Sequence, residues 1–232
     1  MLYKYDEIPS SLKQKYIGSG TYGRVYKTSD NRVYKQFKYP NQPHDRVILM
    51  HDLGLEVPSD IFVFPEDLVY KKDLLMGYLT RYINGNSFDY MRQDIKLSTL
   101  ISELKRFERE VVVYSSMNIY LSDFHQGNLF FGDDDKIYTL DTDDFFYYSS
   151  DKEKNTLEKN LVQISYPIIN GVLDGQISFK NKKLNYDKNT CFLGGILSSD
   201  FIREVINELS LYSESNIETV GDLQEGISLI LK

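Results

Sequence analysis

The chain has 232 residues, of which 41% are hydrophobic and 14% aromatic, a composition typical of a folded globular protein rather than a disordered one. This length fits one domain or two small lobes and excludes a multidomain protein. A net charge of −7 disfavours nonspecific nucleic-acid binding, because contacts with phosphate backbones need a basic surface.

The sequence predicts an intracellular location. Cys191 is the only cysteine, so an intrachain disulfide is impossible and a reducing compartment is expected. The first residues lack the apolar core of a signal peptide, and no apolar run approaches the roughly 20 residues of a membrane span. We therefore expect a soluble cytoplasmic protein with neither a membrane nor a nucleic acid as partner.

Residues 1–83 predict a small lobe made mainly of β-strands. Short apolar segments bounded by turn residues indicate the strands, and apolar residues at helical spacing before Gly54 indicate one helix. The predicted strands are 14–17, 24–28, 32–37, 61–64 and 74–83, and the predicted helix is 47–53. A five-stranded sheet with one helix is expected.

After Ile83 the pattern becomes largely helical. Apolar residues recur at i, i+3, i+4 and i+7 between Leu97 and Ser115, as in an amphipathic helix with one face in a core. A hairpin with an acidic, glycine-containing turn follows, and then three further helices. The hairpin strands are 129–131 and 137–140, and the helices are 156–173, 199–212 and 220–231. The expected fold class is α+β.

A glycine-rich turn joins the first two predicted strands, with the pattern Gly-Ser-Gly-Thr-Tyr-Gly-Arg-Val from Gly18 to Val25. Glycine lets the backbone approach phosphate oxygens and aim N–H groups at them, because no Cβ is in the way. Val25, two residues beyond Gly23, is placed to cover an adenine ring. The alternative is a glycine-rich hairpin without a ligand. The strand–turn–strand setting disfavours a dinucleotide site, in which the turn opens a helix.

Lys35 alternates with Val33 and Phe37 along the third strand, so these three side chains should share one face. A cation on the buried side of a strand costs free energy unless it is paired. The best-placed partner is Asp45 on the following helix. The alternative carboxylates are Asp52, Glu56 and Glu66.

Asp123 and Asn128 lie in one short loop with the sequence Asp-Phe-His-Gln-Gly-Asn. A carboxylate at the end of a strand can accept the proton of an attacking hydroxyl, and an amide oxygen five residues later can hold a divalent cation. His125 lies between them, where a donor or cation would contact a transferred phosphate. The alternative for His125 is a loop histidine bonded to the backbone.

Asp141 ends the apolar strand 137–140, where a carboxylate is well placed to bridge metal ions to phosphates. Asp143 and Asp144 follow it directly. The hydrophobic strand before Asp141 distinguishes this acidic group from the one at 133–135, which is typical of a solvated turn.

In this order the motifs resemble the protein-kinase-like superfamily, which includes eukaryotic-type protein kinases and the aminoglycoside and choline phosphotransferases. The resemblance covers approximately residues 17–145 and implies a two-lobed kinase fold in one domain, with a β-rich lobe at about 1–83 and a reduced, mainly helical lobe at about 84–232. It implies ATP and Mg²⁺ as cofactors, with Mn²⁺ as an alternative metal.

The resemblance also implies roles for individual residues. Asp123 becomes the catalytic base, assisted by Lys35 and His125, and Asn128 and Asp141 become the metal ligands. Thr80 matches the gatekeeper position, and the next three residues would offer backbone groups to adenine. The nucleotide-binding residues implied are Gly18, Gly20, Tyr22, Gly23, Val25, Lys35, Thr80, Arg81, Tyr82 and Ile83.

Departures from the family pattern bear on regulation. Leu121-Ser122-Asp123 replaces the His-Arg-Asp of the family, so no arginine beside the base can receive an activation-loop phosphate. The segment 141–143 reads Asp-Thr-Asp in place of Asp-Phe-Gly, and no Ala-Pro-Glu follows. Regulation by phosphorylation of an activation segment is therefore not expected.

The expected function is transfer of the γ-phosphate of ATP to a hydroxyl acceptor, a Ser, Thr or Tyr of a protein. A small-molecule kinase of the aminoglycoside or choline type is an alternative, because the loop from Asp123 to Asn128 is closer to that type. A pseudokinase that binds nucleotide and regulates by shape is another, and transfer of the nucleotidyl group is a third.

Overall fold

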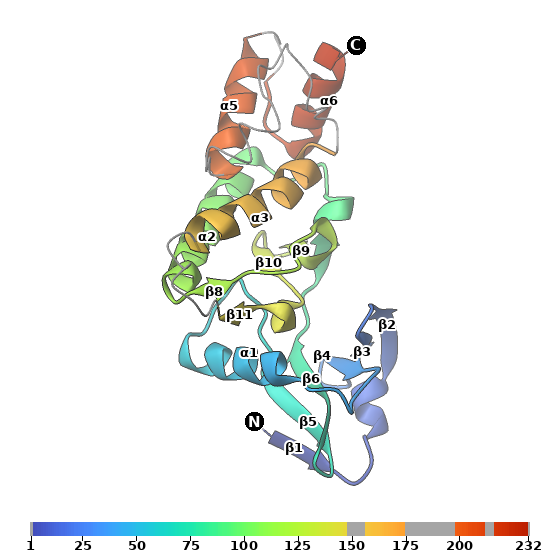
Figure 1. The fold of residues 1–232 in the computed structure, drawn as a ribbon. Helices are drawn as coiled ribbons and strands as arrows, with labels where there is room; N and C mark the ends of the chain where they lie inside the picture. The colour runs from blue at the N-terminus through green and yellow to red at the C-terminus, as the bar shows by residue number, and fades with distance from the viewer. Residues whose placement is uncertain (1, 148–155, 175–197, 212–215, 232) are drawn as a thin grey trace. The chain divides into compact units, whose positions relative to one another are not determined.

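The computed structural model describes residues 2–147, 156–174, 198–211 and 216–231 of the chain. The chain forms two compact units (Figure 1). The first unit comprises Met1–Ile83 together with Leu140–Phe146, and the second comprises Asn84–Thr139 together with Tyr147–Lys232. Sheets and helices are both present, so the α+β class expected from the sequence is confirmed.

The first unit is built on a six-stranded sheet with the strand order β1-β5-β6-β4-β3-β2. Strands β2 to β6 pair antiparallel with their neighbours, and β1 joins the edge parallel to β5. The strands are β1 (Leu2–Tyr5), β2 (Lys15–Ser19), β3 (Gly23–Lys27), β4 (Arg32–Phe37), β5 (Asp67–Lys71) and β6 (Leu74–Arg81).

Two features of this sheet differ from the sequence prediction. The pattern does not predict β1, whose pairing with β5 joins segments far apart in the chain. The predicted strand at 61–64 is wrong, because β5 begins only at Asp67. The side chains of residues 61–64 are all buried. Their apolar run therefore reflects burial on every side, which periodicity alone cannot distinguish from a strand.

Both faces of the sheet are covered. The helix α1 (Asp45–Glu56) packs on one face, where its Val47 joins a cluster with Phe37 and Tyr78 (Figure 1). The short 3₁₀ helix η1 (Ser10–Lys13) belongs to the other face, where Leu12 packs with Tyr34 and two further buried residues. The predicted alternation along β4 is confirmed, because Tyr34 and Phe37, an odd number of residues apart, enter these two separate clusters.

The segment 140–146 belongs to the first unit although it follows the hairpin of the second. Its 3₁₀ turn η4 (Thr142–Asp144) is anchored by the Thr142 hydroxyl, which donates to the Val63 carbonyl at 3.0 Å. Phe145 is buried and packs edge-on against Phe62, with ring centroids 5.7 Å apart. The irregular, buried stretch at 61–64 thus provides the platform for this segment.

The second unit combines a small sheet with helices. The hairpin of β9 (Leu129–Gly132) and β10 (Ile137–Thr139) is extended by β7 (Gly85–Ser87). A Cβ at Gly85 would lie 2.3 Å from the Phe131 carbonyl oxygen, so the pairing of β7 with β9 requires glycine there. Shorter elements of this unit are η2 (Phe88–Tyr90), β8 (Ile119–Tyr120) and η3 (Gln126–Asn128), and β11 (Phe146–Tyr147) spans the point at which the chain returns from the first unit.

The described residues of this unit also form four longer helices: α2 (Leu97–Ser116), α3 (Thr156–Val172), α5 (Ser198–Ser210) and α6 (Val220–Leu231). Each confirms a helix predicted from periodicity. α2 packs against α3 and α5 (Figure 1). Its core face carries Leu100, Leu104 and Phe107, which are fully buried, whereas Val112 is exposed. Across the described residues, none of the helices is both long and apolar enough to span a membrane.

Candidate active site

The centre of the β4 strand carries the predicted phosphate-binding lysine. The register of β3, β4 and β6 places Val25 and Tyr78 on either side of Lys35 in one row across the sheet. Residues paired in this way project to the same face. Lys35 and Tyr78 are 7% and 3% exposed, so the prediction that Lys35 faces inward is confirmed.

Two carboxylates from the segment 140–146 bind the ammonium group of Lys35. Its Nζ lies 2.9 Å from Oδ1 of Asp141 and 3.0 and 3.1 Å from the two oxygens of Asp143. The Tyr78 hydroxyl donates a hydrogen bond to the same Asp143 carboxylate at 2.9 Å. This arrangement supplies the charge compensation that a buried lysine needs.

The predicted pairing of Lys35 with Asp45 is therefore wrong. Asp45 is exposed at the start of α1, and Asp52 on the same helix hydrogen-bonds to His51 at 2.9 Å. The physical reason is the docking of η4, which brings Asp143 to the sheet face from a distant part of the sequence.

Electrostatics favour the charged form of Lys35. Burial alone would lower the pKa of Lys35, but the neighbouring Asp143 and Asp141 carboxylates outweigh that effect and raise it. Burial and the same Asp143 raise the pKa of Tyr78 well above its usual value. Lys35 is consequently a permanent cation, and Tyr78 is a neutral hydrogen-bond donor at physiological pH.

The three glycines of the glycine-rich turn have different environments. A Cβ at Gly23 would lie 3.1 Å from both Cγ of Lys35 and the Gln36 carbonyl oxygen, so packing against β4 favours glycine. Within the described part of the chain, no atom lies within 4 Å of a Cβ built at Gly18 or Gly20, and neither residue has a positive φ. Neither packing nor backbone conformation therefore explains why Gly18 and Gly20 are glycines.

Hydrogen bonds hold this turn closed. The Gly20 N–H donates to the Gly23 carbonyl at 3.0 Å, and the Lys38 ammonium donates to the Gly20 carbonyl at 2.6 Å. The Lys38 N–H donates to the Tyr22 carbonyl at 2.9 Å, while the Tyr22 ring is 58% exposed. The N–H of Gly20 would have to leave its internal partner to reach a phosphate.

The residues predicted to bind adenine lie at and beyond the end of β6. Thr80 is buried, and its hydroxyl donates to the Phe64 carbonyl at 2.9 Å. The Arg81 guanidinium donates to the carbonyls of residues 59 and 60 at 3.2 and 2.9 Å. Nζ of Lys27 lies 3.9 Å from the centroid of the Tyr82 ring. The side chains of Thr80, Arg81 and Tyr82 therefore contact other residues of the first unit. Ile83 is half-buried and is the last residue of the first segment of that unit.

The predicted catalytic loop lies in the second unit. Asp123 is exposed, and its backbone carbonyl accepts a hydrogen bond from the Asn128 side-chain amide at 3.1 Å. This bond uses Nδ2 of Asn128, so it leaves the amide oxygen available to a cation. Nδ1 of His125 accepts from the Gly127 N–H at 3.2 Å. That contact matches the alternative in which His125 binds the backbone, while its other ring nitrogen plays no part in it.

Asp123 and Asp141 share an unusual backbone conformation. Their φ angles are 56° and 55°, in the left-handed region that costs a non-glycine residue about 1–2 kcal/mol. Among the described residues, the other non-glycine residues with positive φ lie in hairpin turns or just after helices, at Asn31, Lys72, Asn118, Asp135 and Asp174. Asp123 and Asp141 have neither setting, and backbone strain of this kind concentrates at functional sites.

Asn160 on α3 supports the segment that leads into Asp123. It is fully buried, and its Oδ1 accepts from the Leu121 N–H at 2.9 Å. Its amide nitrogen donates to the Ser115 hydroxyl at 2.9 Å and to the Ile119 carbonyl at 2.8 Å. Asn160 and Tyr78 are not among the residues predicted from the sequence, and Asp143 has no predicted role. A polar residue on the apolar face of α3 was the available signal for Asn160.

The chemistry of the predicted metal ligands fits Mg²⁺, which prefers carboxylate and amide oxygens. Asp141 has a half-exposed carboxylate, 43% accessible. The hydrogen bond from Asn128 to the Asp123 carbonyl uses the amide nitrogen of Asn128 and not its amide oxygen. These two residues belong to different units. Within the residues that the structure describes, no group of three or more His, Cys, Asp or Glu side chains forms a metal site.

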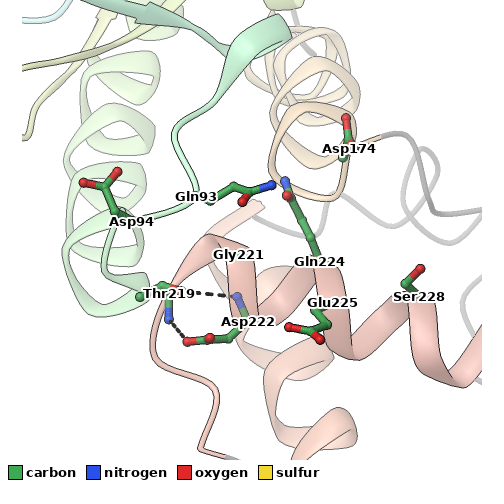
Figure 2. Close-up of a pocket in the computed structure, with 9 residues that line it drawn as sticks. All are labelled: Gln93, Asp94, Asp174, Thr219, Gly221, Asp222, Gln224, Glu225 and Ser228. Atoms are coloured by element: carbon green, nitrogen blue, oxygen red, sulfur yellow. Dashed lines mark hydrogen bonds between the residues drawn. The ribbon is translucent and has the colours of Figure 1, made fainter.

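A polar cavity of about 610 Å³ lies in the second unit, beside α6 (Figure 2). The side chains of Gln93 and Gln224 point toward each other there. One of its acidic residues, Asp222, has a structural role, because it accepts from the Thr219 N–H at 2.8 Å near the start of α6. The sequence-predicted site residues do not line this cavity. Its lining is Gln93, Asp94, Asp174, Thr219, Gly221, Asp222, Gln224, Glu225 and Ser228.

The sequence matches no protein-family model and no curated protein. The function is therefore inferred from the residues and their geometry.

Proposed function

We propose that this protein is an ATP- and Mg²⁺-dependent phosphotransferase that transfers the γ-phosphate to a hydroxyl, with protein Ser, Thr or Tyr as the acceptor class. One observation carries the proposal. In the first unit, Lys35 contacts residues from two other predicted motifs, because Asp141 binds its ammonium and Gly23 packs on its side chain. A chance set of motifs has no reason to converge on one buried cation.

The environment of Lys35 suits phosphate binding. It is a permanent cation held between carboxylates, one of which is half-exposed at Asp141. Lysine binds phosphate as a compact point charge, as the lysine of many nucleotide sites does. A purely structural ion pair would not require the exposed second carboxylate, whereas metal binding would.

The glycine-rich turn supports the same function. Glycine at a position with free space and an ordinary backbone conformation suggests that something outside the chain needs that space. Gly18 and Gly20 meet both conditions. A triphosphate that approaches the backbone closely would account for them, whereas a ligand-free hairpin would tolerate alanine.

In the proposed reaction, Asp123 is the proton acceptor and Lys35 is the cation that binds the phosphates. Asp123 accepts the proton of the acceptor hydroxyl as the oxygen of that hydroxyl bonds to the γ-phosphorus and the bond to the leaving ADP oxygen breaks. Lys35 compensates phosphate charge. A bound Mg²⁺, held by Asn128 and Asp141, would neutralise further charge on the phosphates.

A small-molecule kinase is the second candidate, favoured by the His and Gly within the loop from Asp123 to Asn128. The chemistry is unchanged in that case, and only the acceptor differs. A pseudokinase would bind nucleotide without transfer, and a nucleotidyl transferase would donate the other part of ATP.

The test is incubation of the purified protein with Mg²⁺ and γ-labelled ATP, with and without a generic protein acceptor, beside an Asp123→Asn variant. Label on protein that disappears in the variant is the expected result. Transfer of the label only to small hydroxyl compounds added as acceptors would indicate a small-molecule kinase. Label from α-labelled ATP would indicate nucleotidyl transfer, and full activity of Asp123→Asn would overturn the assignment of the base.

A further inference from the structure

We propose that Asp143 and Tyr78 are positioning residues that hold Lys35 for the phosphotransfer, in the role expected of a carboxylate on α1. This inference rests on the proposed function. Asp143, which has no role predicted from the sequence, holds the ammonium group of Lys35. Tyr78 in turn holds the carboxylate of Asp143.

Asp141 and Asp143 differ in ways that suit different roles. Asp143 is 9% exposed and contacts Nζ of Lys35 with both oxygens, whereas Asp141 is 43% exposed and contacts it with one. The Tyr78 hydroxyl donates a hydrogen bond to Oδ1 of Asp143 at 2.9 Å. Tyr78 is also the residue of β6 that pairs with Lys35 of β4. Asp141 can therefore exchange Lys35 for a cation without breaking the buried pair, and Asp143 keeps the lysine in place.

Lys35, Tyr78 and Asp143 all belong to the first unit. Lys35 and Tyr78 are paired across β4 and β6, and Asp143 lies in η4, which Thr142 ties to Val63. η4 also contacts α1, where Nη1 of Arg46 lies 3.8 Å from Oδ1 of Asp144. The carboxylate partner of Lys35 thus comes from η4, and Asp45 on α1 is exposed.

The deciding experiment is a double-mutant cycle on ADP release from MgATP, with kcat and KM for ATP measured separately. The variants are Asp143→Asn, Lys35→Met and the double variant, with Asp45→Asn as the matched change on α1. We expect Asp143→Asn to lower kcat/KM about 10- to 100-fold, as misplacement of a reacting group does. The double variant should be no slower than Lys35→Met, because Asp143 acts through Lys35. Asp45→Asn should match the wild type.

Tyr78→Phe keeps the ring and removes one hydroxyl, so it tests the same cluster if Asp143→Asn fails to fold. We expect a several-fold loss of kcat/KM that also disappears in the Lys35→Met background. Losses that multiply in the double variants, or an Asp143→Asn enzyme as active as Asp45→Asn, would overturn the inference while leaving the proposed function intact. A folded wild-type protein that never turns over MgATP would overturn both.

Discussion

Lys35 and Asp143 stand 108 positions apart in the chain and form a buried ion pair, with Nζ 3.0 and 3.1 Å from the two carboxylate oxygens. The pair is completed by the Tyr78 hydroxyl and by the more exposed Asp141. Such a pair adds little net stability compared with an apolar replacement, but breaking it leaves a charge buried without a partner. Its presence is thus better explained by function than by folding.

Replacement of Lys35 by Met should destabilise the protein. Asp143 would remain buried with its charge uncompensated, a change that typically costs about 3–5 kcal/mol. Lys15→Met, on the exposed strand β2, should change the free energy of unfolding by less than about 0.5 kcal/mol. Urea denaturation of both variants measures the difference. Equal stability of the two would show that the ion pair is not maintained in solution.

The double variant Lys35→Met/Asp143→Asn provides a second check of this pair. It removes both charges, so it should recover part of the stability lost by Lys35→Met alone. Additive losses in urea denaturation would contradict a direct interaction between the two residues.

Alanine at Gly20 should weaken ATP binding without destabilising the fold. The space around Gly20 accepts a Cβ, so stability should stay equal to that of the wild type or rise by up to about 1 kcal/mol. Gly85→Ala is the opposite case, because its Cβ would meet the Phe131 carbonyl oxygen and disrupt β7. Melting temperatures with and without MgATP separate the two effects. Wild-type ATP affinity in Gly20→Ala would remove the glycine support for the nucleotide site.

Replacement of Asn160 by Leu should loosen the segment before Asp123. The change leaves buried groups of Ser115, Ile119 and Leu121 without their partner, and it should cost about 2–4 kcal/mol. Ser115→Ala removes one of the three bonds and should cost about 1 kcal/mol. Urea denaturation measures both, and hydrogen exchange at the Leu121 amide should accelerate in Asn160→Leu. An unchanged exchange rate there would contradict the supporting role of Asn160.

The stability of the second unit should depend on the protonation of Glu108. This carboxylate is buried and accepts from the N–H and hydroxyl of Ser199 at 2.9 and 2.6 Å. Burial raises the pKa of Glu108 above its ordinary 4.5, although the Ser199 hydrogen bonds oppose the shift. The folded state then binds the proton more tightly than the unfolded state, so the stabilisation is complete below pH 4.5 and is lost as the pH rises through the folded-state pKa.

Glu108→Gln removes this titration. Relative to that variant, the free energy of unfolding of the wild type should fall as the pH rises above 4.5. Glu204→Gln, at an exposed position on α5, should show no such trend relative to the wild type. A difference between wild type and Glu108→Gln that is constant with pH would disprove the effect.

Local sequence patterns predicted much of the secondary structure. β4 and α6 have the predicted bounds, and α2 extends one residue beyond its prediction. These elements follow from periodicities of two and about 3.6 residues, which any short window contains. β1 and the segment 61–64 were missed or misassigned because strand pairing and burial on all sides depend on distant residues.

The sequence by itself determined which residue types are available for phosphate chemistry and that Lys35 points into the protein. The tertiary structure alone decided its partner, because Asp143 rather than Asp45 comes within 3.0 Å of Nζ. A carboxylate bonds to a buried lysine only where the folded backbone holds the two groups in contact. In this chain, the hydrogen bond from Thr142 to Val63 anchors η4 and so brings Asp143 to Lys35. No local sequence pattern predicts this contact.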